Sequence, residues 1–159
     1  MKLVLMRHAE AADLTTDGER YLTEKGHNDA KNMGRVLKNC NWQWLEVRTS
    51  PLLRARQTAD HVASGLGMTA KVDSLLKPDV IIQKFKESLG SLDHSSALLC
   101  VFHMPDVAIL AAHFLEIDDS RFYIPPGSAI GLNLASRGSC LQVFHYQPDF
   151  LTNLSTIVS

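Results

Sequence analysis

Short apolar runs alternate along this chain with longer segments whose apolar residues recur every three or four positions. The short runs predict strands, and the helical spacing predicts amphipathic helices. The predicted strands cover residues 3–6, 45–49, 71–75, 97–102, 128–134 and 140–146. The predicted helices cover residues 24–39, 51–66, 82–92 and 105–116. Residues 8–22 are polar and irregular, which predicts a loop, and residues 136–139 predict the turn between the last two strands.

Helix-start signals support this division. Thr23 is a capping residue before the first helix, and Ser50-Pro51 predicts the second start, with Ser as cap and Pro at the first helical position. Strands that alternate with helices predict a three-layer α/β/α sandwich with a mostly parallel central sheet. The 159 residues fit a single domain over 1–159. Ligands of such sheets bind at the carboxyl ends of the strands, so the residues after each strand matter most.

Composition narrows the classes of partner. The net charge is −1, which does not favour a nucleic-acid or membrane-surface binder. The apolar stretch at residues 3–6 is too short for a signal peptide, and no segment approaches the roughly 18 apolar residues of a membrane span. Three cysteines are few and odd in number, which favours a reducing compartment. We therefore expect a cytoplasmic protein with no nucleic-acid or membrane partner.

Basic side chains follow three of the predicted strands. Arg7 and His8 end the first strand, Ser50 follows the second with Arg54 in the next helical turn, and His103 follows the most apolar strand. Parallel strands bring these residues to one edge of the sheet. Arginine matches phosphate oxygens in a bidentate fork, and free N–H groups at a helix start add an anion site. The convergence predicts a phosphate pocket.

A histidine in such a pocket can act as the nucleophile toward phosphorus. Its ordinary pKa of about 6.5 leaves it mostly neutral at pH 7, and neighbouring arginines lower that pKa further. Covalent transfer to His8 would divide one difficult displacement into two easier ones, and Arg7 and Arg54 would neutralise the phosphoryl oxygens. This chemistry needs no metal or other cofactor, and none is expected.

Other motifs do not compete with this interpretation. The remaining histidines form no metal-ligand pair such as His-Glu-x-x-His, and we interpret them as surface or core residues; they are His27, His61, His94, His113 and His145. Arg48 and Arg56 are expected on solvated faces. Residues 65–70 are similar to a dinucleotide-binding turn, but they follow a helix and precede a strand, which is the reverse of the required order. The chain has no P-loop and no Cys-phosphatase loop.

Taken in order, these segments resemble the histidine phosphatase superfamily. The matching motifs are residues 5–10, 22–26, 50–59 and 102–105, and the resemblance covers about residues 1–135. The short length resembles the branch of small bacterial phosphohistidine phosphatases of the SixA type. The resemblance implies that His8 is the nucleophile and that Arg7, Arg54 and His103 line the phosphate pocket, with Ser50 as a further contact.

Two departures from the superfamily pattern stand out. Phe102 replaces the usual small residue before the second histidine, so an altered pocket wall is expected. No acidic residue directly follows His103, so the proton donor for the leaving group is open between Asp79, Asp106 and no side chain. The phosphohistidine of a signalling or phosphotransfer protein is the expected substrate. The alternatives are a phosphatase of small phosphoesters and a non-catalytic module that binds phosphorylated ligands.

Overall fold

The computed structural model describes residues 1–13, 20–90, 92–93, 95–118, 123–134 and 140–148. Most predicted elements are present in the predicted order. The strands are β1 (Lys2–Arg7), β2 (Trp44–Thr49), β3 (Ala70–Val72), β4 (Ala97–Phe102), β5 (Ala129–Leu134) and β6 (Cys140–Tyr146). The helices are α1 (Glu24–Lys38), α2 (Leu53–Leu66), α3 (Ile82–Leu89) and α4 (Asp106–Leu115), with a short 3₁₀ helix at Ser74–Leu76.

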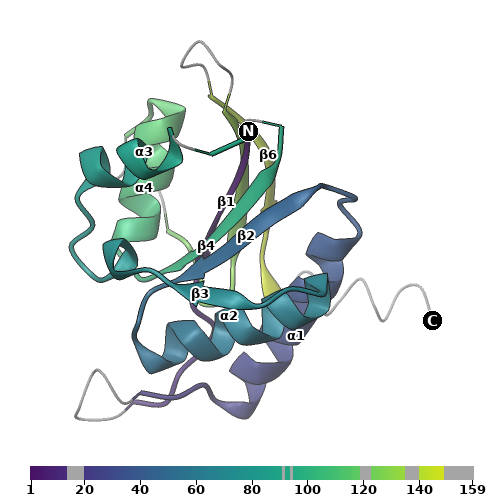
Figure 1. The fold of residues 1–159 in the computed structure, drawn as a ribbon. Helices are drawn as coiled ribbons and strands as arrows, with labels where there is room; N and C mark the ends of the chain where they lie inside the picture. Colours follow the sequence, from purple (N-terminus) through teal and green to yellow (C-terminus); the bar gives the residue numbers. More distant parts are fainter. Residues whose placement is uncertain (14–19, 91, 94, 119–122, 135–139, 149–159) are drawn as a thin grey trace.

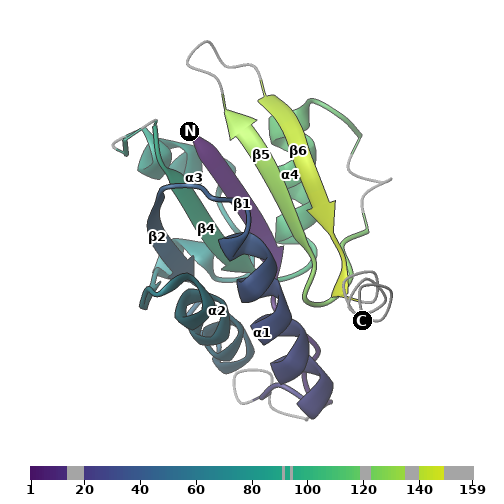
Figure 2. The same cartoon turned by 90° about the vertical axis from the view of Figure 1, so that its right-hand side faces the viewer.

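The strands form one sheet in the order β3-β2-β4-β1-β5-β6. β1, β2, β3 and β4 pair in parallel, whereas β5 runs antiparallel to both β1 and β6. Only β5 is therefore reversed, and the carboxyl ends of the other five strands meet at one edge. Helices α1 and α2 cover one face of the sheet, and α3 and α4 cover the other (Figures 1 and 2). The predicted α/β/α sandwich with a mostly parallel sheet is confirmed.

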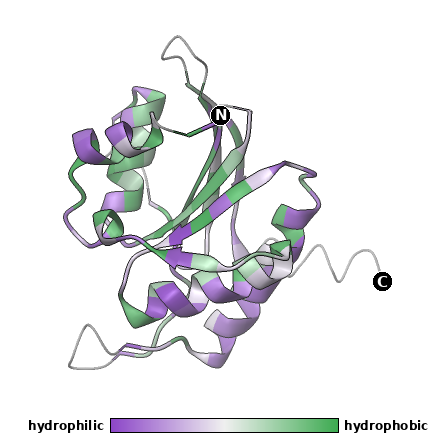
Figure 3. Ribbon diagram, viewed as in Figure 1, coloured by the Kyte–Doolittle hydropathy of each residue, from purple (hydrophilic) through white to green (hydrophobic). Residues whose placement is uncertain are grey.

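The central strands are buried on both faces, which explains their continuous apolar runs. Leu3 and Leu5 of β1 point into the core under α3 and α4, whereas Val4 and Met6 point into the core under α1 and α2. The hydropathy colouring shows mostly apolar central strands and many polar residues along α1 and α2 (Figure 3). A sheet held between two cores is a rigid base for the loops that follow its strands.

Several predicted boundaries shift. α2 begins at Leu53, with Leu52 in the capping position, so the prediction that Ser50 caps this helix is wrong. The strand predicted at 71–75 is shorter, because the chain turns into the 3₁₀ helix after Val72. The helix predicted at 82–92 ends at Leu89. Thr23 caps α1 as predicted, since its side chain accepts a hydrogen bond from the Gly26 N–H. The turn predicted at 136–139 lies outside the described residues.

Candidate active site

Three neighbouring strands deliver the predicted residues to the carboxyl edge of the sheet. β1 ends at Arg7, so His8 lies where the strand becomes a loop. The His8 N–H donates to Phe102 O at 3.0 Å, and His8 O accepts from Gly127 N at 3.0 Å. The backbone of His8 is therefore fixed between the end of β4 and the start of β5. Its side chain is buried, with 7% of the residue exposed.

The ring of His8 is held at both nitrogens. Nδ1 lies 2.8 Å from Ala9 O, and a carbonyl oxygen only accepts, so Nδ1 carries the proton of the neutral ring. Nε2 then keeps its lone pair, which accepts from Arg54 Nε at 3.2 Å. Nε2 is therefore the nitrogen that can attack an electrophile.

Burial is the main reason that His8 stays neutral. The pKa of His8 is lowered to about 3, with burial as the largest cause and the charges of His103, Arg54 and Arg7 as smaller causes in the same direction. The hydrogen bond to the Ala9 carbonyl acts in the opposite direction. The sequence predicts the contribution of the arginines but not the larger contribution of burial.

His103 stands beside His8. The two ring centroids are 5.3 Å apart, and the rings are tilted by 53°. His103 Nε2 shares a hydrogen bond of 2.8 Å with Ser50 Oγ, and the Ser50 hydroxyl also accepts from Leu52 N at 3.4 Å. Ser50 therefore orients His103. Ser50 is connected to His8 through His103, and the sequence does not predict this positioning role.

Two arginines supply positive charge. Arg54 is buried in the first turn of α2, a helix start that has neither a side-chain cap nor an acidic residue. Arg7 donates from one terminal nitrogen to Ile124 O at 2.9 Å, while its buried Nε has no hydrogen-bond partner among the described residues. A helix start and two guanidinium groups around a neutral histidine form a site suited to a phosphoryl group.

The two candidate proton donors occupy the loop before α3 and the start of α4. Asp106 is buried, and its carboxylate accepts from Asp79 N at 3.3 Å and from Val80 N at 2.9 Å. Asp79 is exposed and has a left-handed backbone with φ of 67°. Asp106 therefore ties the loop at Asp79 and Val80 to α4. Within the described residues, neither carboxylate forms a hydrogen bond with His8.

The packing places three other residues. Phe102 is fully buried and packs edge-to-face against Phe85, with ring centroids 5.4 Å apart, so its side chain lies in the core and the altered pocket wall stays a prediction. Arg48 is mostly buried and pairs with Glu46 at 2.7 Å, so its predicted solvated position is wrong. Arg56 is exposed, as predicted.

The other described histidines lie on α1, α2, α4 and β6. His27 and His61 bond to each other at 2.8 Å between α1 and α2, which makes them a partly buried structural pair. His113 is exposed on α4, His145 lies on β6, and His94 lies outside the described residues. Within the described residues, no three His, Cys, Asp or Glu side chains group closely enough to hold a metal ion.

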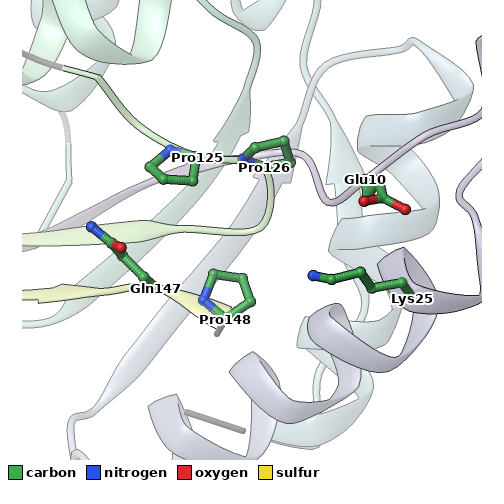
Figure 4. Close-up of a pocket in the computed structure, with 6 residues that line it drawn as sticks. All are labelled: Glu10, Lys25, Pro125, Pro126, Gln147 and Pro148. Carbon is green, nitrogen blue, oxygen red and sulfur yellow. The ribbon is translucent and has the colours of Figure 1, made fainter. Parts of the chain in front are cut away.

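A pocket of about 190 Å³ adjoins the site. Pro125 and Pro126 face the end of β6 across it, and Glu10 and Lys25 lie on the α1 side (Figure 4). Its other lining residues are Gln147 and Pro148. None of the four predicted phosphate-pocket residues lines it, but Glu10 lies two residues after His8, and Pro125 follows Ile124, whose carbonyl accepts from Arg7.

Along the described part of the chain, no helix has the length and apolar character of a membrane span.

Comparisons of the sequence and the fold with known proteins support the predicted resemblance. The family model of the histidine phosphatase superfamily (branch 1) matches residues 3–77. Phosphohistidine phosphatase SixA of Escherichia coli K12 is 31% identical over 118 residues, which cover 70% of this chain and 73% of that protein. An uncharacterized protein of Picosynechococcus sp. is 35% identical over 113 residues, covering 67% and 68% of the two chains. A solved structure of the protein histidine phosphatase SixA with tungstate is 26% identical, covers 95% of this chain and 99% of its own, and superimposes with a TM-score of 0.84.

Proposed function

Because this chain belongs to the histidine phosphatase superfamily, we propose that it hydrolyses phosphohistidine in proteins through a covalent intermediate on His8. The observation that carries the proposal is the state of His8 Nε2. It is the unprotonated nitrogen of a buried neutral ring, and it lies beside Arg54 and His103. A nucleophile of this kind is ready to attack without first losing a proton.

In the first step, the Nε2 lone pair attacks phosphorus while the bond to the leaving group breaks. Arg7, Arg54 and the N–H groups at the start of α2 stabilise the negative charge on the phosphoryl oxygens. In the second step, water attacks phosphorus, the bond to Nε2 breaks, and inorganic phosphate leaves. The electron pair of the broken P–N bond returns to Nε2, so His8 becomes neutral again, and the protons of the attacking water leave with the phosphate. The arginines and the helix start supply the charge that a metal supplies in other phosphatases, so we propose a metal-independent reaction.

The leaving group favours a phosphohistidine substrate. An alkyl phosphate leaves as an alkoxide, which needs a positioned proton donor worth about 10²–10⁴ in rate. A phosphohistidine leaves as imidazole, and a ring with a pKa of about 6.5 takes its proton readily near pH 7. Asp106 already accepts two backbone N–H groups, and Asp79 is exposed. A site without a dedicated acid serves an imidazole leaving group better than an alkoxide.

The partner we propose is a phosphohistidine-bearing signalling or phosphotransfer protein. A relative that carries the name phosphohistidine phosphatase supports this choice. The expected setting stays the cytoplasm, on the ground of three free cysteines, a composition typical of reducing compartments.

The decisive experiment traps the intermediate. Rapid acid-free quenching with a ³²P-labelled phosphohistidine protein should place acid-labile, base-stable label on His8. His8→Ala should lose both label and turnover, whereas the matched control His113→Ala, an exposed histidine on α4, should keep both. Label or substantial turnover in the His8→Ala protein would overturn the proposed mechanism. Absence of turnover in the native protein on every phosphorylated substrate would favour a binding module.

Substrate comparison tests the finer proposal. kcat/KM for a phosphohistidine protein should exceed that for phosphoserine or a sugar phosphate by about 10² or more, given the missing acid. EDTA should leave the rate unchanged. Asp79→Asn and Asp106→Asn should not slow the alkyl phosphate selectively; selective slowing by either would identify that residue as the acid. Equal kcat/KM values for the two classes would favour a small-molecule phosphatase.

A further inference from the structure

We propose that Thr58 is a positioning residue whose hydroxyl sets the tautomer and aim of the His8 ring by joining the catalytic loop to α2. The catalytic part of this proposal rests on the proposed function. The structural part concerns a ring of contacts around His8 and stands on the geometry alone.

The hydroxyl of Thr58 makes two hydrogen bonds within a fully buried environment. It accepts from the Ala9 N–H at 3.0 Å and donates to Arg54 O at 2.7 Å. The second bond is the common local contact of a helical threonine with the carbonyl four residues earlier. The first is not local, because it reaches across 49 residues to the loop that carries His8.

These two bonds complete a closed circuit of hydrogen bonds. His8 Nδ1 donates to Ala9 O, the Ala9 N–H donates to Thr58, Thr58 donates to Arg54 O, and Arg54 Nε donates to His8 Nε2. Both nitrogens of the nucleophile are therefore connected to the same hydroxyl through one residue on each side. On the Ala9 side the connection fixes which nitrogen carries the proton. On the Arg54 side it fixes the guanidinium that meets the reactive nitrogen.

The circuit gives the Thr58 hydroxyl a task that a methyl group cannot perform. Valine has nearly the same shape but no donor or acceptor, so Thr58→Val would leave the Ala9 N–H, which that hydroxyl satisfies, without its partner in a buried setting. An unsatisfied buried donor is costly, and residue 9 would shift to recover a hydrogen bond. Because the N–H and the carbonyl of Ala9 flank the same Cα, this shift would also move the Ala9 carbonyl away from His8 Nδ1. Thr58→Ser keeps the hydroxyl and should preserve the circuit.

The kinetic test separates positioning from a general loss of structure. Thr58→Val should lower kcat on a phosphohistidine protein by about 10–100-fold, the usual effect of removing an orienting partner, while KM changes little. Thr58→Ser should restore most of kcat. Unchanged kcat in the valine variant, or an equal loss in the serine variant, would overturn the role of the hydroxyl.

The ring nitrogens of His8 provide a readout that does not depend on turnover. In ¹⁵N NMR spectra, with the His8 signals assigned by their loss in His8→Gln, the native protein and Thr58→Ser should show one neutral form protonated at Nδ1. Thr58→Val should show a mixture of the two neutral forms. Thr49→Val is the matched control, because the buried Thr49 hydroxyl donates to Ser50 O and not to the loop at Ala9 or to the Arg54 carbonyl. It should leave the His8 signals unchanged.

The two readouts distinguish the possible failures. If the native protein hydrolyses no phosphorylated substrate but the tautomer shifts in Thr58→Val, the proposed function fails and the positioning of His8 stands. If the native protein is active and the tautomer is the same in Thr58→Val, the positioning proposal fails alone. Thermal melting of each variant reports whether it is folded. If Thr58→Val is destabilised, its kcat and its ¹⁵N spectra are measured below its melting temperature, and Thr49→Val is measured at the same temperature.

Discussion

His8 is a titratable side chain that the fold keeps uncharged. Backbone groups at the end of β4 and just before β5 bond to its main chain, and burial is the largest influence on its pKa. The burial that keeps the proposed nucleophile neutral also makes its protonation unfavourable in the folded state. The protein should therefore lose stability in acid at this one position.

The sign of this effect follows from the two pKa values. In the unfolded chain His8 has a pKa of about 6.5, and in the folded protein the pKa is lowered to about 3. Between these values the unfolded state binds more protons, so the free energy of unfolding falls as the pH drops from 6.5 toward 3. From pH 7 to pH 4.5, native protein should lose about 2–3 kcal/mol more than His8→Gln, measured by urea denaturation at both pH values.

His61 and His145 also have lowered pKa values, mainly because of burial. They are present in both proteins, so their contributions cancel in the comparison. Equal losses in the native and His8→Gln proteins would contradict a buried neutral His8.

The sequence predicts which side chains of the candidate site follow the strands. It does not predict the hydrogen bonds and the burial that surround them. Arg7, His8, Arg54 and His103 follow strands or open a helix, and these positions are readable from the apolar pattern. Thr58 and Ser50 act through hydrogen bonds to segments about 50 residues away. No local pattern records such partners, since a helical threonine and a serine before proline each have an ordinary local explanation.

Helix α1 and the loop that carries His8 meet in a contact that only glycine permits. A Cβ on Gly26 would overlap the carbonyl oxygen of Glu10. Two hydrogen bonds stabilise the same contact. Thr23 N donates to Glu10 O at 3.0 Å, and Thr23 Oγ1 donates to the Glu10 carboxylate at 2.7 Å. The segment at residues 22–26 therefore holds the loop that carries His8 against the start of α1.

Gly26→Ala should disturb both stability and catalysis. The added methyl group must push the Glu10 backbone away, at a cost of about 1–3 kcal/mol in the free energy of unfolding. Because Glu10 follows Ala9, the shift should also lower kcat on a phosphohistidine protein. Gly90→Ala is the matched control, since its Cβ would meet only Glu87 O at 3.5 Å. It should change the stability by less than about 0.5 kcal/mol and leave kcat unchanged. Equal behaviour of the two variants would show that the loop does not depend on this contact.

Helix boundaries near the site were the least predictable elements. Ser50-Pro51 has every local feature of a helix start, yet α2 begins at Leu53. The Ser50 N–H donates to Val101 O of β4, and the Ser50 hydroxyl bonds to His103. These contacts hold Ser50 beside β4, although its local propensity favours the start of a helix. The tertiary contact delays the helix and leaves its first turn open beside Arg54. The departure from local propensity thus lies at the functional site.

The complete site exists only when the whole sheet is assembled. His8 follows β1, Ser50 follows β2, His103 follows β4, and the carbonyl that holds Arg7 comes just before β5. An anion bound among these groups would connect segments that span most of the chain. Its binding free energy would then add to the stability of the fold as a unit, since the unfolded chain has no such site.

A phosphate-like oxyanion should therefore stabilise the protein against heat. Vanadate or tungstate at about 100 times its Kd should add about 2.7 kcal/mol, which raises Tm by about 5–10 °C for a chain of this size. Arg54→Met should remove most of this shift, because it deletes the buried guanidinium beside His8 Nε2. Arg56→Met is the matched control on the same helix, where the side chain is exposed, and it should retain the full shift.

Sodium chloride at equal ionic strength should give no comparable rise in Tm, because the screening of exposed charges does not depend on a specific binding site. The measurement is differential scanning fluorimetry over a range of oxyanion concentrations. If Arg54→Met and Arg56→Met show the same shift, the anion binds elsewhere and the assembled edge is not the phosphoryl site.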